Sequence, residues 1–129
     1  TKKVDQVAQT LGLENLLNLR ATKLTADQKQ LISLGRGLVR EDVAAILMDE
    51  PLTVIDPDLK FRLRRRLKEI NELYKSTLIY VTHDQNEAMT FADNIIVINH
   101  GAIVESGKHE ELLKLNGLYA EMWNKQKHS

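Results

Sequence analysis

The chain has 129 residues, of which 43% are hydrophobic, so it can bury a core without disulfides or metal ions. It contains no cysteine, which excludes a disulfide scaffold. Eighteen basic residues balance eighteen acidic ones, and because no overall field would attract a polyanion we expect no nucleic-acid partner.

The first part of the chain is predicted to be helical. Apolar residues at helical spacing predict a helix over residues 2–11, and a short helix follows near residues 14–19. Thr25 and Gln28 have the spacing of a capping box, so we expect a longer helix from there to residue 40.

Strands and helices are then predicted to alternate. The apolar run 43–48 stops abruptly at two carboxylates and a proline, as expected of a strand buried on both faces of a parallel sheet. Residues 59–74 carry an apolar face at helical spacing and predict a crossover helix. Residues 77–82 predict a second buried strand, and Asp84 is placed to cap a helix over 85–92.

The last part of the chain predicts a hairpin and two helices. The β-rich runs 94–99 and 102–105 flank His100-Gly101, which is typical of a tight turn. We expect this hairpin to continue the parallel sheet. A helix follows around 109–115, and a last amphipathic stretch from residue 118 leads into a polar tail that we expect to fray.

Two carboxylates stand where the first predicted strand ends. Asp49 and Glu50 follow the run 43–48, and ligands bind at the carboxyl edge of a parallel sheet. Neighbouring side chains leaving a strand diverge, so one carboxylate can approach Mg²⁺ while the other faces an attacking water. This division of work suits nucleotide hydrolysis, although the same residues could simply end a strand in a solvated loop.

A histidine follows the next predicted strand. His83 comes directly after the run 77–82, so its imidazole would stand at the same edge of the sheet as Asp49 and Glu50. There it could hydrogen-bond a terminal phosphate and hold the water in line. A structural histidine bonded to a loop carbonyl is the alternative.

Together with the segment 53–56, these motifs resemble the ATP-binding domain of ABC transporters in order and spacing, over nearly the whole chain. The resemblance implies ATP and Mg²⁺ as cofactors. It also implies that Asp49 is the Walker B carboxylate that serves the metal, Glu50 the general base, Asp56 the D-loop aspartate at a dimer contact, and His83 the switch histidine.

The segment before the longer helix lies where that family has its signature, normally Leu-Ser-Gly-Gly-Gln. Thr25 keeps a hydroxyl and Gln28 its amide, but Ala26 and Asp27 replace both glycines, which would allow close approach to phosphate. In the family this signature closes on ATP held by a second subunit. Asp27 therefore either turns away within the helix cap or weakens the partner's ATP site by charge repulsion.

The fold class predicted from the resemblance is α/β, a three-layer fragment similar to P-loop NTPases with a partial, mostly parallel sheet. Residues 1–40 would end the helical subdomain, and residues 41–129 would form the C-terminal part of the ATPase core. No Gly-x-x-x-x-Gly-Lys-Ser/Thr string is present, since residues 101–108 miss its spacing and belong to the hairpin. We expect a fragment without the P-loop strand, with an exposed sheet edge and uncovered apolar surface. Such a chain alone should neither bind ATP tightly nor hydrolyse it.

The function implied by the resemblance is that of an energy-coupling ATPase subunit. Residues 81–93 look like the importer branch for sugars, polyols and osmolytes, whereas residues 109–120 resemble exporter domains. The expected partners are a second ABC ATPase domain and transmembrane permease subunits, at the cytoplasmic face of the cell membrane. The alternatives are a non-enzymatic interaction module descended from such ATPases and an exporter ATPase domain.

Other conspicuous residues have simpler interpretations. We interpret the arginines of the crossover helix as residues of a solvent-exposed helix face. His100 and His109 flank the hairpin without the neighbours that a zinc site needs, and we interpret both as loop residues. Tyr119, Met122 and Trp123 are expected to pack in the core.

Overall fold

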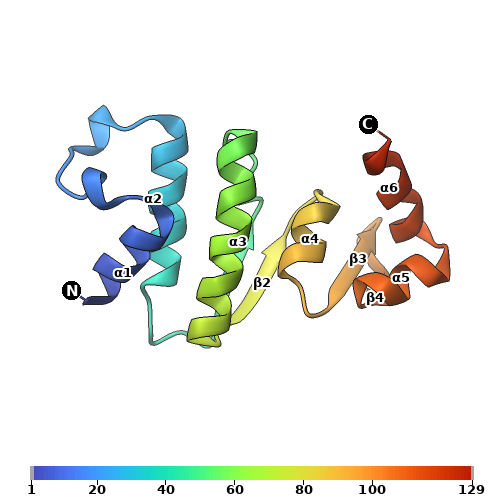
Figure 1. Cartoon of the computed structure of the whole chain (residues 1–129). Helices are drawn as coiled ribbons and strands as arrows, with labels where there is room; N and C mark the ends of the chain where they lie inside the picture. Colours follow the sequence, from blue (N-terminus) through green and yellow to red (C-terminus); the bar gives the residue numbers. More distant parts are fainter. Residues whose placement is uncertain (1, 129) are drawn as a thin grey trace. The chain divides into compact units, whose positions relative to one another are not determined.

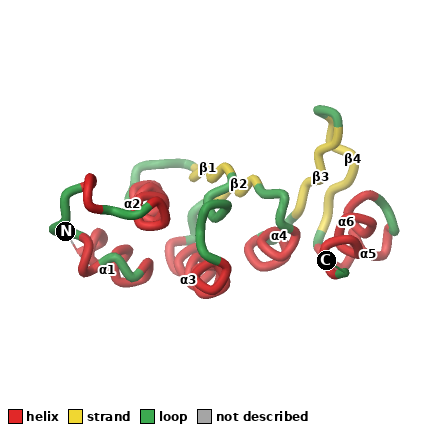
Figure 2. The backbone as a smooth tube through the Cα atoms, turned by 90° about the horizontal axis from the view of Figure 1, so that it is seen from above, coloured by secondary structure: helices red, strands yellow, loops and turns green. Residues whose placement is uncertain are grey.

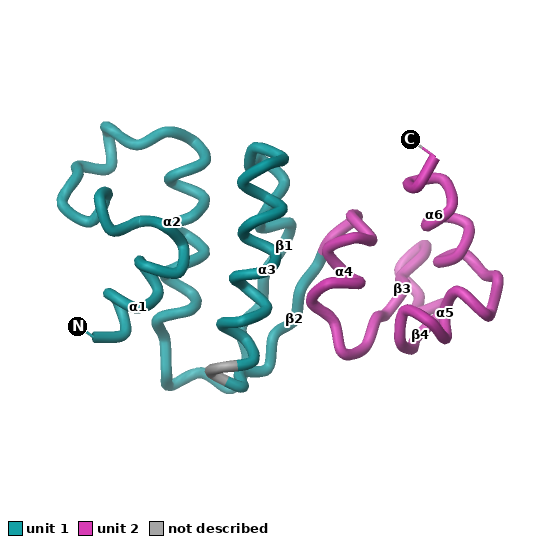
Figure 3. Tube along the Cα trace, viewed as in Figure 1, with its two compact units in different colours: residues 1–81 teal, residues 82–129 magenta. Residues whose placement is uncertain are grey.

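The computed structural model describes residues 2–128, apart from the side chains of Leu73 and Tyr74, and it divides into two compact units. Figure 3 colours them as Thr1–Val81 and Thr82–Ser129. The first unit contains α1 (Lys2–Leu11), the 3₁₀ turns η1 (Glu14–Leu16) and η2 (Ala21–Lys23), α2 (Ala26–Leu38), β1 (Ala45–Asp49), α3 (Pro57–Tyr74) and β2 (Thr77–Val81). The second contains α4 (Gln85–Phe91), β3 (Ile95–Asn99), β4 (Ala102–Gly107), α5 (His109–Leu115) and α6 (Leu118–Lys127), in the chain order that Figure 1 follows by colour.

The first helix has the bounds predicted from its apolar spacing, and its glycine stop has a left-handed backbone with φ 68° at Gly12. The helix expected over 14–19 is only the short turn η1, followed by further turns. A glycine lies inside α2 because α1 comes close there: a Cβ on Gly35 would lie 3.3 Å from the Leu11 Cδ1 atom. Glycine at this position lowers the intrinsic stability of α2, but it allows α1 to approach closely.

Both strands of the first unit run in parallel, with Ala45 opposite Thr77 and Asp49 opposite Val81. Helix α3 makes the crossover between them. The Asp56 side chain caps the start of α3, and Lys75, which has a left-handed backbone with φ 49°, ends it. The predicted apolar face of α3 is buried at Leu63, Leu67 and Ile70. Its predicted last member, Tyr74, lies outside the described side chains.

Helices α2 and α3 cover one face of this sheet, and α1 packs against these two helices (Figure 2). Ile46 and Met48 of β1, with Leu78 and Tyr80 of β2, line the same small cavity as the apolar residues of α2 and α3. The opposite face is open, since the Leu47 side chain is 74% exposed and Ile79 and Val81 are also exposed. The prediction that β1 is buried on both faces is therefore wrong, and the prediction of uncovered apolar surface is confirmed. The reason is that the described residues of this unit supply helices to one face only.

The second unit has a sheet of its own. Strands β3 and β4 form an antiparallel hairpin through His100 and Gly101, with φ 48° and 77°, as the turn residues predict. A bulge follows Val97, which lies opposite Glu105. The prediction that the hairpin continues the parallel sheet is wrong, because β1 pairs with β2 alone and β3 with β4 alone among the described strands. A hairpin finds its partner locally through its turn, so it forms without a neighbouring sheet.

The core of the second unit joins the hairpin to the last two helices. Its buried members are Ile95 and Val97 of β3, Leu112 of α5 and Tyr119 of α6. The helix predicted around 109–115 is confirmed as α5, so the interpretation of His109 as a loop residue is wrong. The His109 ring lies edge-on to Tyr119 and Trp123. The polar tail predicted to fray is instead helical as far as Lys127. The prediction that Met122 packs in the core is wrong, because this side chain lies on the exposed side of α6.

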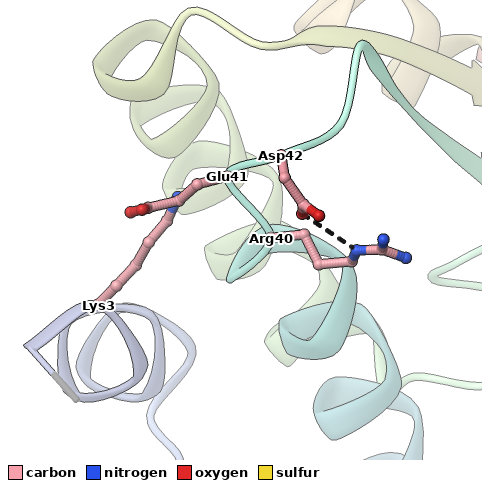
Figure 4. A network of polar contacts seen from close by, with 4 residues as sticks. All are labelled: Lys3, Arg40, Glu41 and Asp42. Atoms are coloured by element: carbon pink, nitrogen blue, oxygen red, sulfur yellow. Dashed lines mark ion pairs between the residues drawn. The ribbon is translucent and has the colours of Figure 1, made fainter.

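The loop that connects α2 with β1 carries two ion pairs, shown in Figure 4. Lys3 lies 3.1 Å from Glu41, which ties the loop to α1, and Arg40 lies 3.7 Å from Asp42. The acidic partners are largely exposed, so each pair stabilises the fold by at most about 1 kcal/mol. Across the described residues, no helix has the length and apolar character needed to span a bilayer.

Candidate functional site

The two carboxylates predicted to carry chemistry lie at the C-terminal edge of the parallel strands. Asp49 is the last residue of β1 and is exposed, and Glu50 follows it and is half-buried. The ladder continues one residue beyond the strand, since the Glu50 N–H donates to the Val81 carbonyl at 2.9 Å. The parallel pairing with β2 therefore fixes the backbone from which the Glu50 carboxylate extends.

Glu50 has an unusual backbone. Its φ is 47°, in the left-handed region that side-chain-bearing residues rarely adopt. This conformation turns the chain sharply out of β1 and into the loop that starts with Pro51, so that the directions of the Asp49 and Glu50 side chains separate. Backbone strain of this kind is found where the surrounding structure holds a functional group in place.

A threonine holds the Glu50 side chain. The Thr53 hydroxyl donates to Glu50 Oε2 at 3.0 Å, and the Thr53 N–H donates to the Glu50 carbonyl at 3.4 Å. The hydroxyl occupies one carboxylate oxygen and leaves Oε1 of Glu50 outside this bond. Nothing in the sequence distinguishes Thr53 from the rest of the segment 53–56, because its partner is defined by the turn after β1.

Helix α2 is joined to the same loop by one hydrogen bond. The Gln30 side-chain amide donates from Nε2 to the Pro51 carbonyl at 2.9 Å, and Pro51 is buried. Gln30 and Pro51 also line an open groove of about 150 Å³ between α2 and β1, which reaches Asp49. Sequence reasoning missed this contact, because nothing in the local pattern indicates the partner of a glutamine 21 positions away.

The altered signature segment forms the cap of α2. The Thr25 hydroxyl accepts from the Gln28 N–H at 3.3 Å, and the Gln28 carbonyl Oε1 accepts from the Thr25 N–H at 2.9 Å. The predicted capping box is therefore confirmed. Asp27 lies in the first turn, where the helix dipole favours a carboxylate, and Ala26 is exposed at the helix start.

Asp56, predicted to serve a dimer contact, caps α3 in this structure. Its Oδ1 atom accepts from the N–H groups of Asp58 and Leu59 at 3.0 and 3.4 Å, and Pro57 occupies the first helical position. The side chain is exposed. Asp56 therefore has a structural role within the chain besides any contact that its second oxygen makes.

His83 belongs to the second unit and is exposed in the loop between β2 and α4. The residues on both sides of it form a polar frame. The Thr82 hydroxyl donates to Glu87 Oε2 at 2.8 Å and accepts from the Asp84 N–H at 3.0 Å, while Asp84 Oδ1 accepts from the Asn86 N–H at 2.8 Å. Glu87 is 2% exposed, so a buried carboxylate anchors the loop that carries the histidine.

The residues that the structure places at the strand ends suit Mg²⁺. Asp49 is an exposed oxygen donor, and within the described part of the chain no group of three possible metal ligands occurs. Mg²⁺ keeps several waters and takes one or two carboxylates together with phosphate oxygens, so a single carboxylate at this edge fits the ion.

Comparison with known proteins gives a consistent result. No protein-family model matches the chain. The trehalose/maltose import ATP-binding protein MalK of Thermococcus litoralis is 43% identical over 111 residues, which are 86% of this chain and 30% of MalK. The sn-glycerol-3-phosphate import ATP-binding protein UgpC of Yersinia pestis is 40% identical over 113 residues, which are 88% of this chain and 31% of UgpC.

A solved structure has the same fold. The ATP-bound structure of a bacterial Atm1-family ABC exporter superposes with a TM-score of 0.80 at 26% identity, and the match covers 98% of this chain and 24% of the exporter chain. A parallel pair of strands with carboxylates at its C-terminal edge therefore occurs here in the fold of a known ATP-binding protein.

The chain is accordingly a homologue of the ATP-binding proteins of ABC transporters, as its motifs predict. MalK and UgpC are both import ATP-binding proteins, which confirms the resemblance to the importer branch. The chain spans about 30% of the length of these curated relatives.

Proposed function

We propose that the chain is part of the ATP-hydrolysing subunit of an ABC transporter that imports a sugar, polyol or similar solute. The observation that carries this proposal is the placement of Asp49 and Glu50 at the carboxyl edge of β1, with the Glu50 N–H bonded to β2. The 43% identity to a trehalose/maltose import protein supports both the activity and the class of solute.

In the proposed reaction, Glu50 accepts a proton from the water that attacks the terminal phosphate of ATP. Thr53 orients the carboxylate by its bond to Oε2, and the left-handed backbone of Glu50 directs it out of the strand. A carboxylate placed in this way supplies general-base catalysis of about 10²- to 10⁴-fold. Mg²⁺, when bound, neutralises charge on the phosphate oxygens, and Asp49 is the residue that would hold it.

His83 is proposed to hydrogen-bond the terminal phosphate and to keep the attacking water in line. An exposed imidazole on a loop anchored by a buried carboxylate combines access with a defined backbone. Phosphate binding itself requires a P-loop. Residues 1–129 contain no such string, so the activity is proposed for the whole protein.

The proposed partners are a second ABC ATPase domain and transmembrane permease subunits, which place the protein at the cytoplasmic face of the membrane. Thr25, Ala26, Asp27 and Gln28 would meet ATP held by the second domain, with Asp56 at the contact between the two domains. The Thr25 hydroxyl accepts one bond in the cap, so its own hydrogen can be donated to a phosphate oxygen. The position of Asp27 within the first turn supports its role in the helix start rather than as a phosphate contact.

The experiment is ATP turnover by the native protein with the substitution Glu50→Gln. We expect turnover to fall by about 10²-fold or more while ATP binding is retained, because the amide keeps the size of the side chain but cannot accept the proton. Turnover equal to that of wild type would refute the assignment of Glu50.

A non-enzymatic module descended from ABC ATPases is the alternative function, favoured by the replacement of both signature glycines by Ala26 and Asp27. It predicts that the native protein binds its partner but hydrolyses no ATP. The substitution Glu50→Gln would then change nothing. A wild-type protein that hydrolyses ATP in a Glu50-dependent way would exclude it.

A further inference from the structure

Helix α6 is bonded to the loop that carries His83. The Gln126 side chain of α6 accepts the Gln85 N–H at its Oε1 atom across 3.1 Å, and it donates from Nε2 to Asp84 Oδ1 across 2.8 Å. The two residues that it contacts, Asp84 and Gln85, come immediately after His83 in the chain. One amide therefore bonds both a backbone donor and a side-chain acceptor of this loop, 41 and 42 positions away in the chain. We call this pair of hydrogen bonds the Gln126 clamp.

The clamp supplies a bond that the loop cannot make by itself. The first N–H groups of a helix have no partner within the helix, and the Asp84 side chain caps the Asn86 N–H. The N–H of Gln85, the first residue of α4, is satisfied by Gln126 instead. Helix α4 has only seven residues, so its first turn depends on such outside contacts.

The Gln85 side chain increases this dependence. It is 5% exposed, and neither atom of its amide group has a hydrogen-bond partner among the described residues. A buried amide without partners favours conformations in which the segment opens to water. The bonds that Gln126 makes to the same segment oppose that opening.

Helix α6 is itself held firmly. The Tyr119 N–H at its start donates to Glu105 Oε2 of β4 at 2.7 Å, and the buried Tyr119 hydroxyl lies 2.8 Å from His109 Nδ1. A continuous set of contacts thus runs from the hairpin through α6 to Asp84 and Gln85. Through Gln126 the position of α6 is transmitted to the loop of His83.

We infer that Gln126 is a positioning residue for His83, and that the C-terminal helix α6 sets the orientation of the loop that carries this imidazole. The inference rests on the proposed function, in which His83 contacts the terminal phosphate. Gln126 itself touches neither phosphate nor water in this role, and it acts only through Asp84 and Gln85.

The test compares Gln126→Met, which keeps the length and apolar volume of the side chain but removes both bonds, with Gln126→Glu, which keeps the shape of the side chain but places a carboxylate against Asp84. Asn124→Met, at an exposed position of the same helix, is the matched control. We expect Gln126→Met to increase amide hydrogen exchange at Gln85 by roughly tenfold, Gln126→Glu to increase it as well because the two carboxylates repel, and Asn124→Met to leave it unchanged.

In the native protein, Gln126→Met and Gln126→Glu should each lower kcat for ATP severalfold with KM unchanged, and Asn124→Met should leave kcat unchanged. A merely structural role would lower the melting temperature without this split between kcat and KM. Gln126→Met with wild-type exchange at Gln85 and wild-type kcat would overturn the inference.

The variant His83→Ala separates this inference from the proposed function. If His83→Ala leaves turnover intact, the proposed role of His83 is wrong, while altered exchange in Gln126→Met still establishes the clamp on the loop. If His83→Ala abolishes turnover and Gln126→Met changes neither exchange nor kcat, the role of His83 stands and that of Gln126 is refuted.

Discussion

Thr53 holds the carboxylate of Glu50 through a hydrogen bond of 3.0 Å between its hydroxyl and Oε2. The two residues lie three positions apart, in the turns that follow β1, and the left-handed backbone of Glu50 brings its side chain back toward Thr53. The bond restricts the carboxylate to one orientation before any substrate arrives. An oriented base avoids reorganisation during the reaction.

Substitution Thr53→Val should therefore lower turnover by the native protein. Valine keeps the branched shape but removes the donor, and a hydrogen bond to a charged group contributes about 1.5–3 kcal/mol, which corresponds to roughly ten- to a hundredfold in rate. The measurement is kcat for ATP at saturating substrate. Thr53→Ser, which keeps the hydroxyl, is the control, and equal loss in both variants would contradict the orientation role.

Gln30→Met should destabilise the first unit. The substitution leaves the buried Pro51 carbonyl without the donor that lies 2.9 Å away, at a cost of about 1–2 kcal/mol in the free energy of unfolding. Urea denaturation of the 129-residue chain measures this cost as a lower midpoint at constant slope. Lys29→Met, on the exposed side of α2, changes helix propensity little and should leave the midpoint unchanged.

Gly117→Ala should disturb the start of α6 through Glu105. A Cβ at position 117 would overlap the Glu105 carboxylate, which accepts the Tyr119 N–H, so the bond and its charge-assisted stabilisation of about 1.5–3 kcal/mol would be weakened. Thermal unfolding measures the loss. In the background Glu105→Ala the same alanine should cost much less, and a double-mutant cycle that gives strictly additive losses would contradict this explanation.

Tyr119 should make the stability of the chain sensitive to alkaline pH. Burial disfavours the phenolate and raises the pKa of Tyr119 above its ordinary value of 10.0. The folded state then binds this proton more tightly than the unfolded state, so the stabilisation is complete below pH 10.0 and is lost as the pH rises through the folded pKa.

The measurement is the free energy of unfolding in urea at pH values on both sides of 10. Tyr119→Phe should reduce the alkaline loss, and at neutral pH it should cost about 1 kcal/mol because the bond to His109 disappears. Tyr80→Phe, at a half-buried position of β2, should retain the loss. An alkaline profile that is the same in Tyr119→Phe and wild type would contradict the role of Tyr119.

Local patterns were sufficient for most elements. The capping box at Thr25 and Gln28 and the hairpin turn at His100 and Gly101 follow from residue spacing, because each depends on neighbours in the chain. The parallel order of the two strands follows from the crossover helix predicted between them. The wrong predictions concern which residues are buried. Leu47 has the sequence of a buried strand residue and is exposed, since burial depends on which other segments supply a covering layer.

The family resemblance and the edge at which Asp49 and Glu50 lie follow from the order of residues along the chain, because a strand that ends in carboxylates presents them at its carboxyl end whatever surrounds it. The side chains that support the site loops depend instead on how the chain folds. Gln30 reaches Pro51 across 21 positions and Gln126 reaches Asp84 across 42, and such partners are chosen by packing between distant elements. A glutamine looks the same in sequence whether its amide meets water or a distant carbonyl, so spacing along the chain cannot reveal its partner.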